Sequence, residues 1–155
     1  MKRHETLIPL THDHHHALAQ VRRLRRVADQ DVDDRRSVCD HFLRFFNHDT
    51  VEHFRQEEEL IFPLAAAAGE AQEVLERALV EHVVINAAVR SLELEQKDGG
   101  PTPETMSKLS GLLEEHIRFE EKVVFPLLQS IVPEAELAAV TLPPRSERTP
   151  PDPVQ

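Results

Sequence analysis

The feature that most constrains the fold is a segment that occurs twice with nearly the same letters. Residues 53–64 read HFRQEEELIFPL, and residues 116–127 read HIRFEEKVVFPL. The copies share seven of twelve positions, namely the His, the Arg, two adjacent Glu, the Phe, the Pro and the Leu. Because the repeat keeps a histidine and two acids as well as apolar residues, it requires a chemical explanation in addition to a packing one.

Hydrophobic periodicity and helix-breaking residues divide the chain into predicted helices. We place four of them at about residues 12–29, 34–65, 70–97 and 103–129, with one more helical turn in PEAELAAV. The polar DQDVDD separates the first two, and DGGPTP is a firm break because Gly and Pro do not continue a helix. Four amphipathic helices with short connections favour an all-α, up-down-up-down four-helix bundle.

The other pair of helices also repeats. DHHHALAQVRRL, from residue 13, resembles EHVVINAAVRSL, from residue 81, with an acid, then a His, then apolar residues at matching positions. The first helix therefore corresponds to the third and the second to the fourth, which predicts a bundle built from a duplicated helical hairpin over residues 1–142. Residues 143–155 contain five prolines and no apolar period, so we predict a disordered tail.

Composition restricts the partners. A length of 155 residues predicts one domain with a substantial core. The net charge of −10 argues against binding to nucleic acid or to an anionic membrane surface. No apolar run reaches about 18 residues, so we expect no membrane span. The single cysteine, Cys39, is predicted to be a buried packing residue, and its isolation favours a cytoplasmic location.

The chain contains ten histidines, and their positions decide which of them carry chemistry. Residues four apart on a helix point the same way, so each HxxxE motif places its His beside its Glu. The His in each of the other two helices belongs to an apolar stripe. Six side chains are therefore predicted to face the bundle core: His14, His53, Glu57, His82, His116 and Glu120.

Two buried carboxylates and four imidazoles, with no Lys or Arg on the same stripes, would be costly to bury without a positive charge. A metal supplies that charge. Imidazole and carboxylate ligands suit iron, manganese or zinc, and two carboxylates shared among four imidazoles favour a two-metal iron site. His48 and Glu52 have the same spacing but lack the downstream Phe-Pro and the repeat, so we do not expect them to bind metal.

Several residues remain open at this point. Glu58 and Glu121 repeat as well, and they are interpreted either as solvent-facing acids or as partners and occasional ligands of the site. Asn86 is interpreted either as a hydrogen-bond donor to a bound ligand or as a core polar group. The remaining histidines are predicted to lie on the surface: His4, His12, His15, His16 and His41. His12 and His16, which share another helix face, are interpreted as surface residues or adventitious metal binders.

The order His, HxxxE, His, HxxxE resembles that of the hemerythrin-like, or HHE cation-binding, domains over about residues 7–140. The resemblance implies a four-helix bundle with two iron ions, bridged by the two carboxylates and an oxo or hydroxo group. By that match the four core histidines would be terminal ligands, and Glu57 and Glu120 would bridge. The family binds or senses oxygen, nitric oxide or peroxide, or handles iron, and the resemblance does not choose among these.

Three hypotheses follow for the function. The first is a non-haem di-iron protein that binds, senses or reduces a small oxidant such as oxygen, peroxide or nitric oxide. The second is a metal-dependent sensor, binding module or iron-handling protein without turnover. The third is a structural bundle whose histidines hold zinc or no metal. Whether the protein is an enzyme, and which protein partner it has, stay open in all three.

Overall fold

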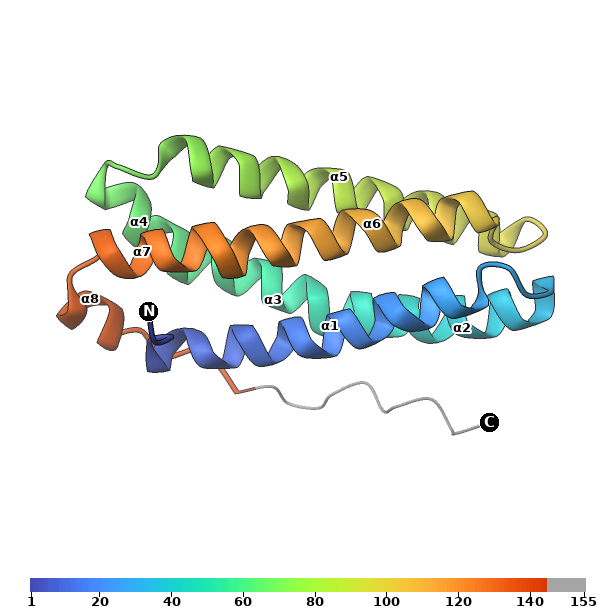
Figure 1. Cartoon of the computed structure of the whole chain (residues 1–155), viewed down its shortest axis with the longest axis horizontal. Helices are drawn as coiled ribbons and strands as arrows, with labels where there is room; N and C mark the ends of the chain where they lie inside the picture. Colours follow the sequence, from blue (N-terminus) through green and yellow to red (C-terminus); the bar gives the residue numbers. More distant parts are fainter. Residues whose placement is uncertain (145–155) are drawn as a thin grey trace.

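Helices make up most of residues 1–144, the part of the chain that the computed structural model describes (Figure 1). In chain order the elements are η1 (Glu5–Leu7), α1 (Ile8–Val27), α2 (Val32–Phe45), η2 (Phe46–Thr50), α3 (Val51–Gln56), η3 (Glu57–Ile61), α4 (Phe62–Ala68), α5 (Gln72–Lys97), α6 (Pro103–Phe119), η4 (Glu120–Val124), α7 (Phe125–Ile131) and α8 (Glu134–Ala138). These residues contain no strand, so the all-α prediction is confirmed. Most of the predicted tail, residues 143–155, lies outside the described residues.

Local sequence signals explain where the helices begin and end. Pro9 lies inside the first turn of α1, where a missing N–H costs nothing, so this helix begins earlier than predicted. Asp31 and Thr102 cap α2 and α6 with side-chain oxygens that accept from backbone N–H groups. Gly69 ends α4 with a φ of 82°, a conformation that Gly adopts without a steric penalty.

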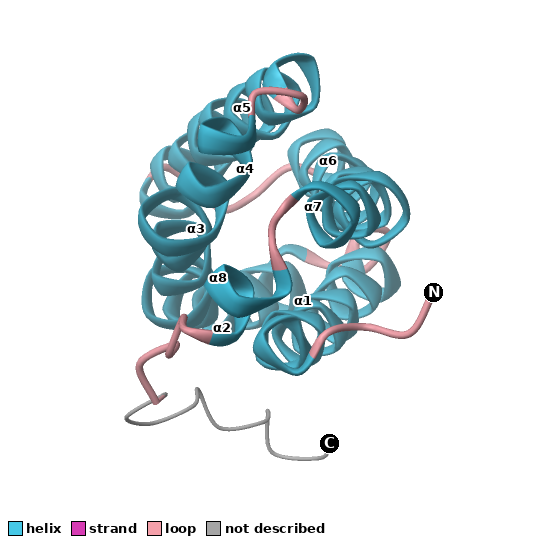
Figure 2. Ribbon diagram, turned by 90° about the vertical axis from the view of Figure 1, so that its left-hand side faces the viewer, coloured by secondary structure: helices cyan, strands magenta, loops and turns pink. Residues whose placement is uncertain are grey.

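The long helical segments lie side by side, and the chain reverses direction after α1, after α4 and after α5 (Figure 1). Helix α1 contacts α2 and α6, while α5 contacts α6 and α2. Seen from the end, the helices surround a common interior (Figure 2). At one end α8 packs against η1, where the Thr6 hydroxyl donates to the Leu137 carbonyl over 3.0 Å.

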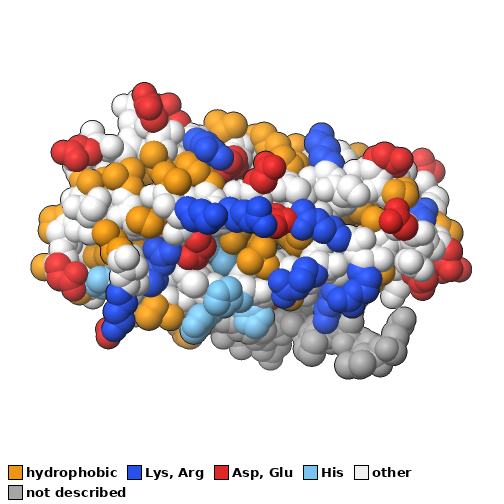
Figure 3. All heavy atoms as spheres, viewed as in Figure 1, with side chains coloured by type: hydrophobic (Ala, Val, Ile, Leu, Met, Phe, Trp, Pro, Cys, Tyr) orange, Lys and Arg blue, Asp and Glu red, His pale blue; other side chains and the backbone are white. Residues whose placement is uncertain are grey.

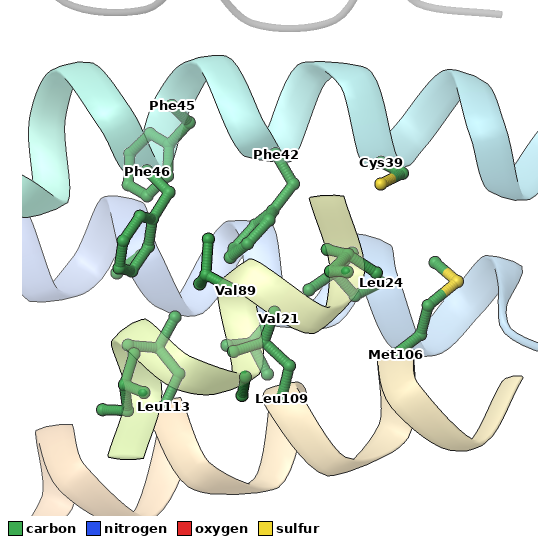
Figure 4. Close-up of a cluster of buried hydrophobic side chains, with 14 of the residues drawn as sticks. Val21, Leu24, Cys39, Phe42, Phe45, Phe46, Val89, Met106, Leu109 and Leu113 are labelled. Carbon is green, nitrogen blue, oxygen red and sulfur yellow. The ribbon is translucent and has the colours of Figure 1, made fainter. Parts of the chain in front are cut away.

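The apolar interior consists of two clusters of buried side chains. One cluster includes the fully buried Cys39, as predicted, together with Phe42 and Phe46, whose side chains point into the core in Figure 4. The other lies around α4, α7 and α8. In α1, His14 falls between Leu10 of the second cluster and Ala17 of the first, and in α5 His82 falls between Ala78 and Ile85 in the same way. In the other two long segments a glutamate falls between the clusters, Glu57 in one and Glu120 in the other. The two clusters therefore leave a polar layer between them.

No helix within residues 1–144 is both long enough and apolar enough to cross a membrane.

Candidate metal centre

The six side chains predicted to face the core meet in this polar layer. None of them is more than 4% exposed. Their ligand atoms form two groups of four, and within each group the atoms lie within 4.8 Å of one another. The first group is His14, His53, Glu57 and Glu120, and the second is Glu57, His82, His116 and Glu120. Both groups contain the same two glutamates, so each pair of histidines shares both carboxylates with the other pair.

Glu57 offers one oxygen to each half of the chain. Its Oε1 lies 3.1 Å from Nε2 of His53, one turn earlier on the same helical segment. Its Oε2 lies 3.4 Å from Nε2 of His82, which belongs to α5. The two oxygens of this carboxylate therefore face histidines of different halves.

Glu120 repeats this arrangement in the second half. Its Oε1 lies 3.1 Å from Nε2 of His116, and its Oε2 lies 3.0 Å from Nε2 of His14. Apart from these contacts with one another, the four glutamate oxygens and Nε2 of His82 and of His116 are buried with no hydrogen-bond partner among the described residues. Buried polar atoms left in this way cost free energy, and a cation between them would satisfy them. The donor set is therefore suited to binding metal ions.

A carboxylate lies behind each of the four imidazoles. Nδ1 of His14 donates to Oε1 of Glu121 over 2.7 Å, and Nδ1 of His82 donates to Oε1 of Glu58 over 2.7 Å. Each of these acids comes from the opposite half of the chain. Because a carboxylate only accepts, Nδ1 must carry a proton, which leaves the Nε2 lone pair of the neutral imidazole free to face the centre. Of the two interpretations of Glu58 and Glu121, the structure supports that of partners of the site.

The remaining two imidazoles have their carboxylates within the same half. Nδ1 of His53 donates to Oδ2 of Asp13, and Nδ1 of His116 donates to Oε2 of Glu81, both over 3.0 Å. Sequence reasoning assigned no role to Asp13 or Glu81. The signal was present, since an acid directly precedes the core His in both copies of the first helix of the hairpin.

A family comparison agrees with this geometry. A model of the hemerythrin HHE cation-binding domain matches residues 8–128. The chain belongs to this family. A comparison with curated proteins and one with solved structures gave no match. The matched range contains all six core side chains and the four acids behind the imidazoles.

Within this hemerythrin HHE domain, each shared glutamate stands at the start of a π-helical turn. η3 begins at Glu57 and η4 at Glu120, and the N–H five residues later bonds to the carbonyl of each. Each turn is followed by a proline, Pro63 or Pro126, which lacks the N–H that a continued α-helix needs. Wide turns of this kind are frequent at functional sites. The repeated Phe-Pro therefore marks where the helix widens beside its glutamate.

Charges within the metal-free HHE site shift its proton affinities. Burial by itself lowers the pKa of His82, but hydrogen bonds to Glu120 and Glu57 and their negative charge raise it to about 10. Burial likewise opposes protonation of His53 and His116, and the nearby carboxylates raise the pKa of each to about 9. Burial also opposes ionisation of both glutamates, whose pKa values are nevertheless lowered by the imidazoles. Protons on the histidines thus supply the positive charge that a metal would supply.

Aromatic rings border the imidazoles. The Phe54 ring stacks on His82 with 3.8 Å between centroids and meets the edge of His116 at 5.5 Å. The Phe125 ring stacks on His14 at 5.6 Å with an interplanar angle of 10°. These contacts restrict rotation of the imidazoles and surround them with apolar surface.

A hollow leads from the surface towards one side of the HHE site. It contains about 350 Å³ of space free of atoms, part of it open to solvent. Its lining includes His14, His53 and His116 from the site and Phe45, Phe54, Leu113 and Ile117 from the core. The exposed His16 also lines it. Histidine side chains gather on the surface over α1 in Figure 3. A small molecule could reach the imidazoles by this route.

The structure also shows whether the other histidines and Asn86 are buried or exposed. His48 is exposed and pairs with Asp49, in agreement with its exclusion. The interpretations of Asn86 were wrong: it is exposed, because it is turned about 100° from Ile85, which lies on the inward stripe of α5. His41 is buried, contrary to its predicted surface position.

Two groups on α1 account for the burial of His41. Its Nε2 accepts from Nη1 of Arg23 at 3.2 Å and lies 3.5 Å from Nε2 of Gln20. The other histidines predicted to lie on the surface are exposed or half-buried: His4, His12, His15 and His16.

Proposed function

We propose that this HHE domain holds two iron ions and binds, senses or reduces a small oxidant. His14 and His53 would be terminal ligands of one ion, and His82 and His116 of the other. Glu57 and Glu120 would bridge the two. The frame would be an up-down-up-down four-helix bundle made of two equivalent hairpins. The sharing of the two glutamates by both groups of four is the observation that carries the proposal.

The pairing of the histidines favours two ions over one. The rings of His14 and His53 lie 4.7 Å apart, and those of His82 and His116 lie 4.8 Å apart. Each pair is approached by one oxygen of Glu57 and one of Glu120. A single ion would leave one pair of imidazoles without a partner, whereas one ion per pair uses every donor atom.

The chain itself supplies positioning, exclusion of water and access. When bound, two ferrous ions would supply electrons to an oxidant such as oxygen, peroxide or nitric oxide. The carboxylates behind the imidazoles keep each Nε2 directed at the centre. Phe54 and Phe125 keep the surroundings apolar. The hollow beside His14 and His53 is a path for a small, uncharged molecule.

Metal analysis is the direct test of the two-iron centre. The protein should be purified without an affinity tag and examined for metal content and optical spectrum. We expect about two iron atoms per chain, since the six side chains form two groups of four potential ligands. Zinc in place of iron, or one atom per chain, would contradict the di-iron proposal and favour a structural role.

The reaction with oxygen tests the oxidant. We expect the ferrous protein to oxidise rapidly in air-saturated buffer, because the hollow gives a small molecule a route from solvent to one side of the site. An oxygen adduct that lasts for minutes and is reversed by removing oxygen would contradict this expectation. Continuous consumption of peroxide or oxygen with a reductant would identify an enzyme, and a single oxidation without turnover would identify a sensor.

One observation favours the sensor, which is the second candidate. Helix α5 carries His82 on its inner side and exposes apolar residues on its outer side. The most exposed are Val83 at 68% and Val80 at 60%, with Leu79 and Val84 at 41% each. Such a face beside a ligand-bearing position is suited to a protein contact that responds to the state of the centre. A partner that binds the ferric and ferrous forms with equal affinity would count against this candidate.

A further inference from the structure

Arg3 lies before the first long helix and reaches across the molecule to the second half of the chain. Its Nη2 donates to Oε2 of Glu121 over 2.6 Å and to the Glu121 carbonyl over 3.0 Å, 118 residues away in sequence. Its Nη1 donates to Oε1 of Gln129 over 3.3 Å. The guanidinium carbon also lies 5.0 Å from the centroid of the Phe125 ring. One side chain therefore contacts three residues, Glu121 of η4 and Phe125 and Gln129 of α7.

Two of these residues, Glu121 and Phe125, contact the same imidazole. Oε1 of Glu121 accepts from Nδ1 of His14 over 2.7 Å, and it also accepts from the Thr11 hydroxyl over 2.7 Å. The Phe125 ring stacks on the His14 ring. Arg3 thus acts on His14 along two routes, through the carboxylate behind the ring and through the aromatic ring beside it.

The other half of the chain lacks this support. Glu58 is the counterpart of Glu121 and accepts from Nδ1 of His82, and Phe62 is the counterpart of Phe125 and stacks on the same ring at 6.1 Å. Within residues 1–144, no Lys or Arg pairs with Glu58, whose side chain is 42% exposed, against 25% for Glu121. The two halves of the chain are therefore alike in the Glu and Phe that contact the imidazole. They differ because, in the described part of the chain, an arginine holds that Glu and Phe only in the second half.

We propose that Arg3 is a positioning residue that fixes Glu121 and Phe125 against His14 and so slows release of the metal held by His14 and His53. The inference rests on the proposed two-metal function. The side chain of Arg3 is 21% exposed, and its planar guanidinium contacts the carboxylate, a carbonyl and a ring at once. This combination orders Glu121 more strongly than an exposed ion pair would.

Release of ferrous iron tests the inference. The full chain is loaded anaerobically with ferrous iron and mixed with a chromogenic chelator in excess. Partners of metal-binding histidines typically change metal affinity by about 10- to 100-fold. Arg3 acts one contact further out, so we expect Arg3→Gln to speed the first release about tenfold, the lower end of that range. Arg3→Lys should restore part of the difference, because it keeps a positive charge beside Glu121.

Arg55→Gln is the matched control. Arg55 lies between His53 and Glu57 in sequence but points outward and pairs with Glu59, four residues on. This variant should release iron at the wild-type rate. Equal release from wild-type, Arg3→Gln and Arg55→Gln proteins would overturn the inference.

A double-mutant cycle tests whether Arg3 acts through Glu121. In a Glu121→Gln background, adding Arg3→Gln should change release by clearly less than the tenfold expected in the wild-type background, because the carboxylate route is already gone and only the route through Phe125 remains. Full additivity of the two substitutions would overturn the proposed route. Melting temperatures of the metal-free variants show whether a substitution lowers the stability of the fold in general. An unchanged metal-free melting temperature means that the substitution affects metal retention alone.

The iron content of the wild-type protein separates failure of the proposed two-iron function from failure of the inference about Arg3. If it retains no ferrous iron, the proposed function fails and the inference fails with it. If it retains two iron atoms and Arg3→Gln behaves like the wild type, only the inference fails.

Discussion

At the scale of single residues, each buried imidazole uses its two nitrogens for different purposes. Nδ1 of His53 is bonded to Asp13, while its Nε2 faces Glu57. The same division holds for the other three, with a carboxylate behind each ring. Because the outer bond fixes both tautomer and orientation, the Nε2 atoms are arranged for binding before any metal arrives.

Removal of one imidazole should therefore affect metal and stability together. We expect His53→Ala or His116→Ala to lose iron and to lower the melting temperature of the iron-loaded protein, since metal that binds only the folded state adds its binding energy to folding. His48→Ala is the control, because His48 has the same HxxxE spacing but is exposed. Iron content and melting curves measure both effects. Loss of iron from His48→Ala with retention in His53→Ala would show that the assigned ligands are wrong.

Phe54 offers a prediction about packing at the site. Its ring stacks on His82 and meets His116 edge-on, so Phe54→Leu should both destabilise the fold by about 1–3 kcal/mol and speed iron release. Phe46→Leu should cost a similar amount, since Phe46 is equally buried, but it should leave iron release unchanged because no imidazole contacts its ring among the described residues. Equal release rates for the two variants would contradict a role for the Phe54 stack.

At the scale of elements, the sequence predicted the helices and the six core residues for one physical reason. The helical period converts spacing into direction, so His53 and Glu57 had to share a face. Period alone does not say which neighbouring helix covers that face. Such contacts between helices decide the roles of Asp13 and Glu81 and the burial of His41. The exposure of Asn86 depends on how α5 is rotated about its own axis. The sequence prediction assigned no role to Asp13 and Glu81 and was wrong for His41 and Asn86.

The C-terminal segment provides a test of where folded structure ends. Deleting residues 143–155 should leave iron content and melting temperature unchanged, because the segment has five prolines and no apolar period with which to bury surface, and the hydrogen bond from Gln56 to the Pro143 carbonyl is long, 3.5 Å. Deleting residues 139–155 should lower the melting temperature, because Val140 and Leu142 pack against the second apolar cluster. A fall of several degrees after the shorter deletion would show that the tail docks on the bundle.

At the scale of the whole molecule, the metal-free protein has an electrostatic core whose balance depends on pH. The pKa values of His53, His82 and His116 are raised to about 9, 10 and 9, above the ordinary 6.5. A pKa raised by folding contributes stability that is complete below about pH 6.5 and is lost as pH rises through the folded value. Metal binding has the opposite dependence, because the imidazoles must lose their protons to act as ligands.

We therefore expect the metal-free protein to melt at a lower temperature as the pH rises from 6.5 to 10. A tenfold difference in proton affinity between the folded and unfolded chain is worth about 1.4 kcal/mol, so a fall of at least about 5 °C is expected for a chain of this length. Thermal melts monitored by circular dichroism, with a chelator present, measure it. Over the same range the affinity for iron should increase. A metal-free melting temperature that is constant or rising across this range would contradict the raised pKa values.

Each half of the chain carries three of the six core side chains, and Glu58 and Glu121 each reach a histidine of the opposite half. Neither hairpin can complete a four-donor group alone. If the backbone were cut in the exposed turn at Gly69, the two fragments should reassemble, and bound metal should stabilise their association. A chelator would then control whether the pieces stay together. The same reasoning implies that two copies of one hairpin, related by a two-fold axis, could have formed such a centre before the two were joined in a single chain.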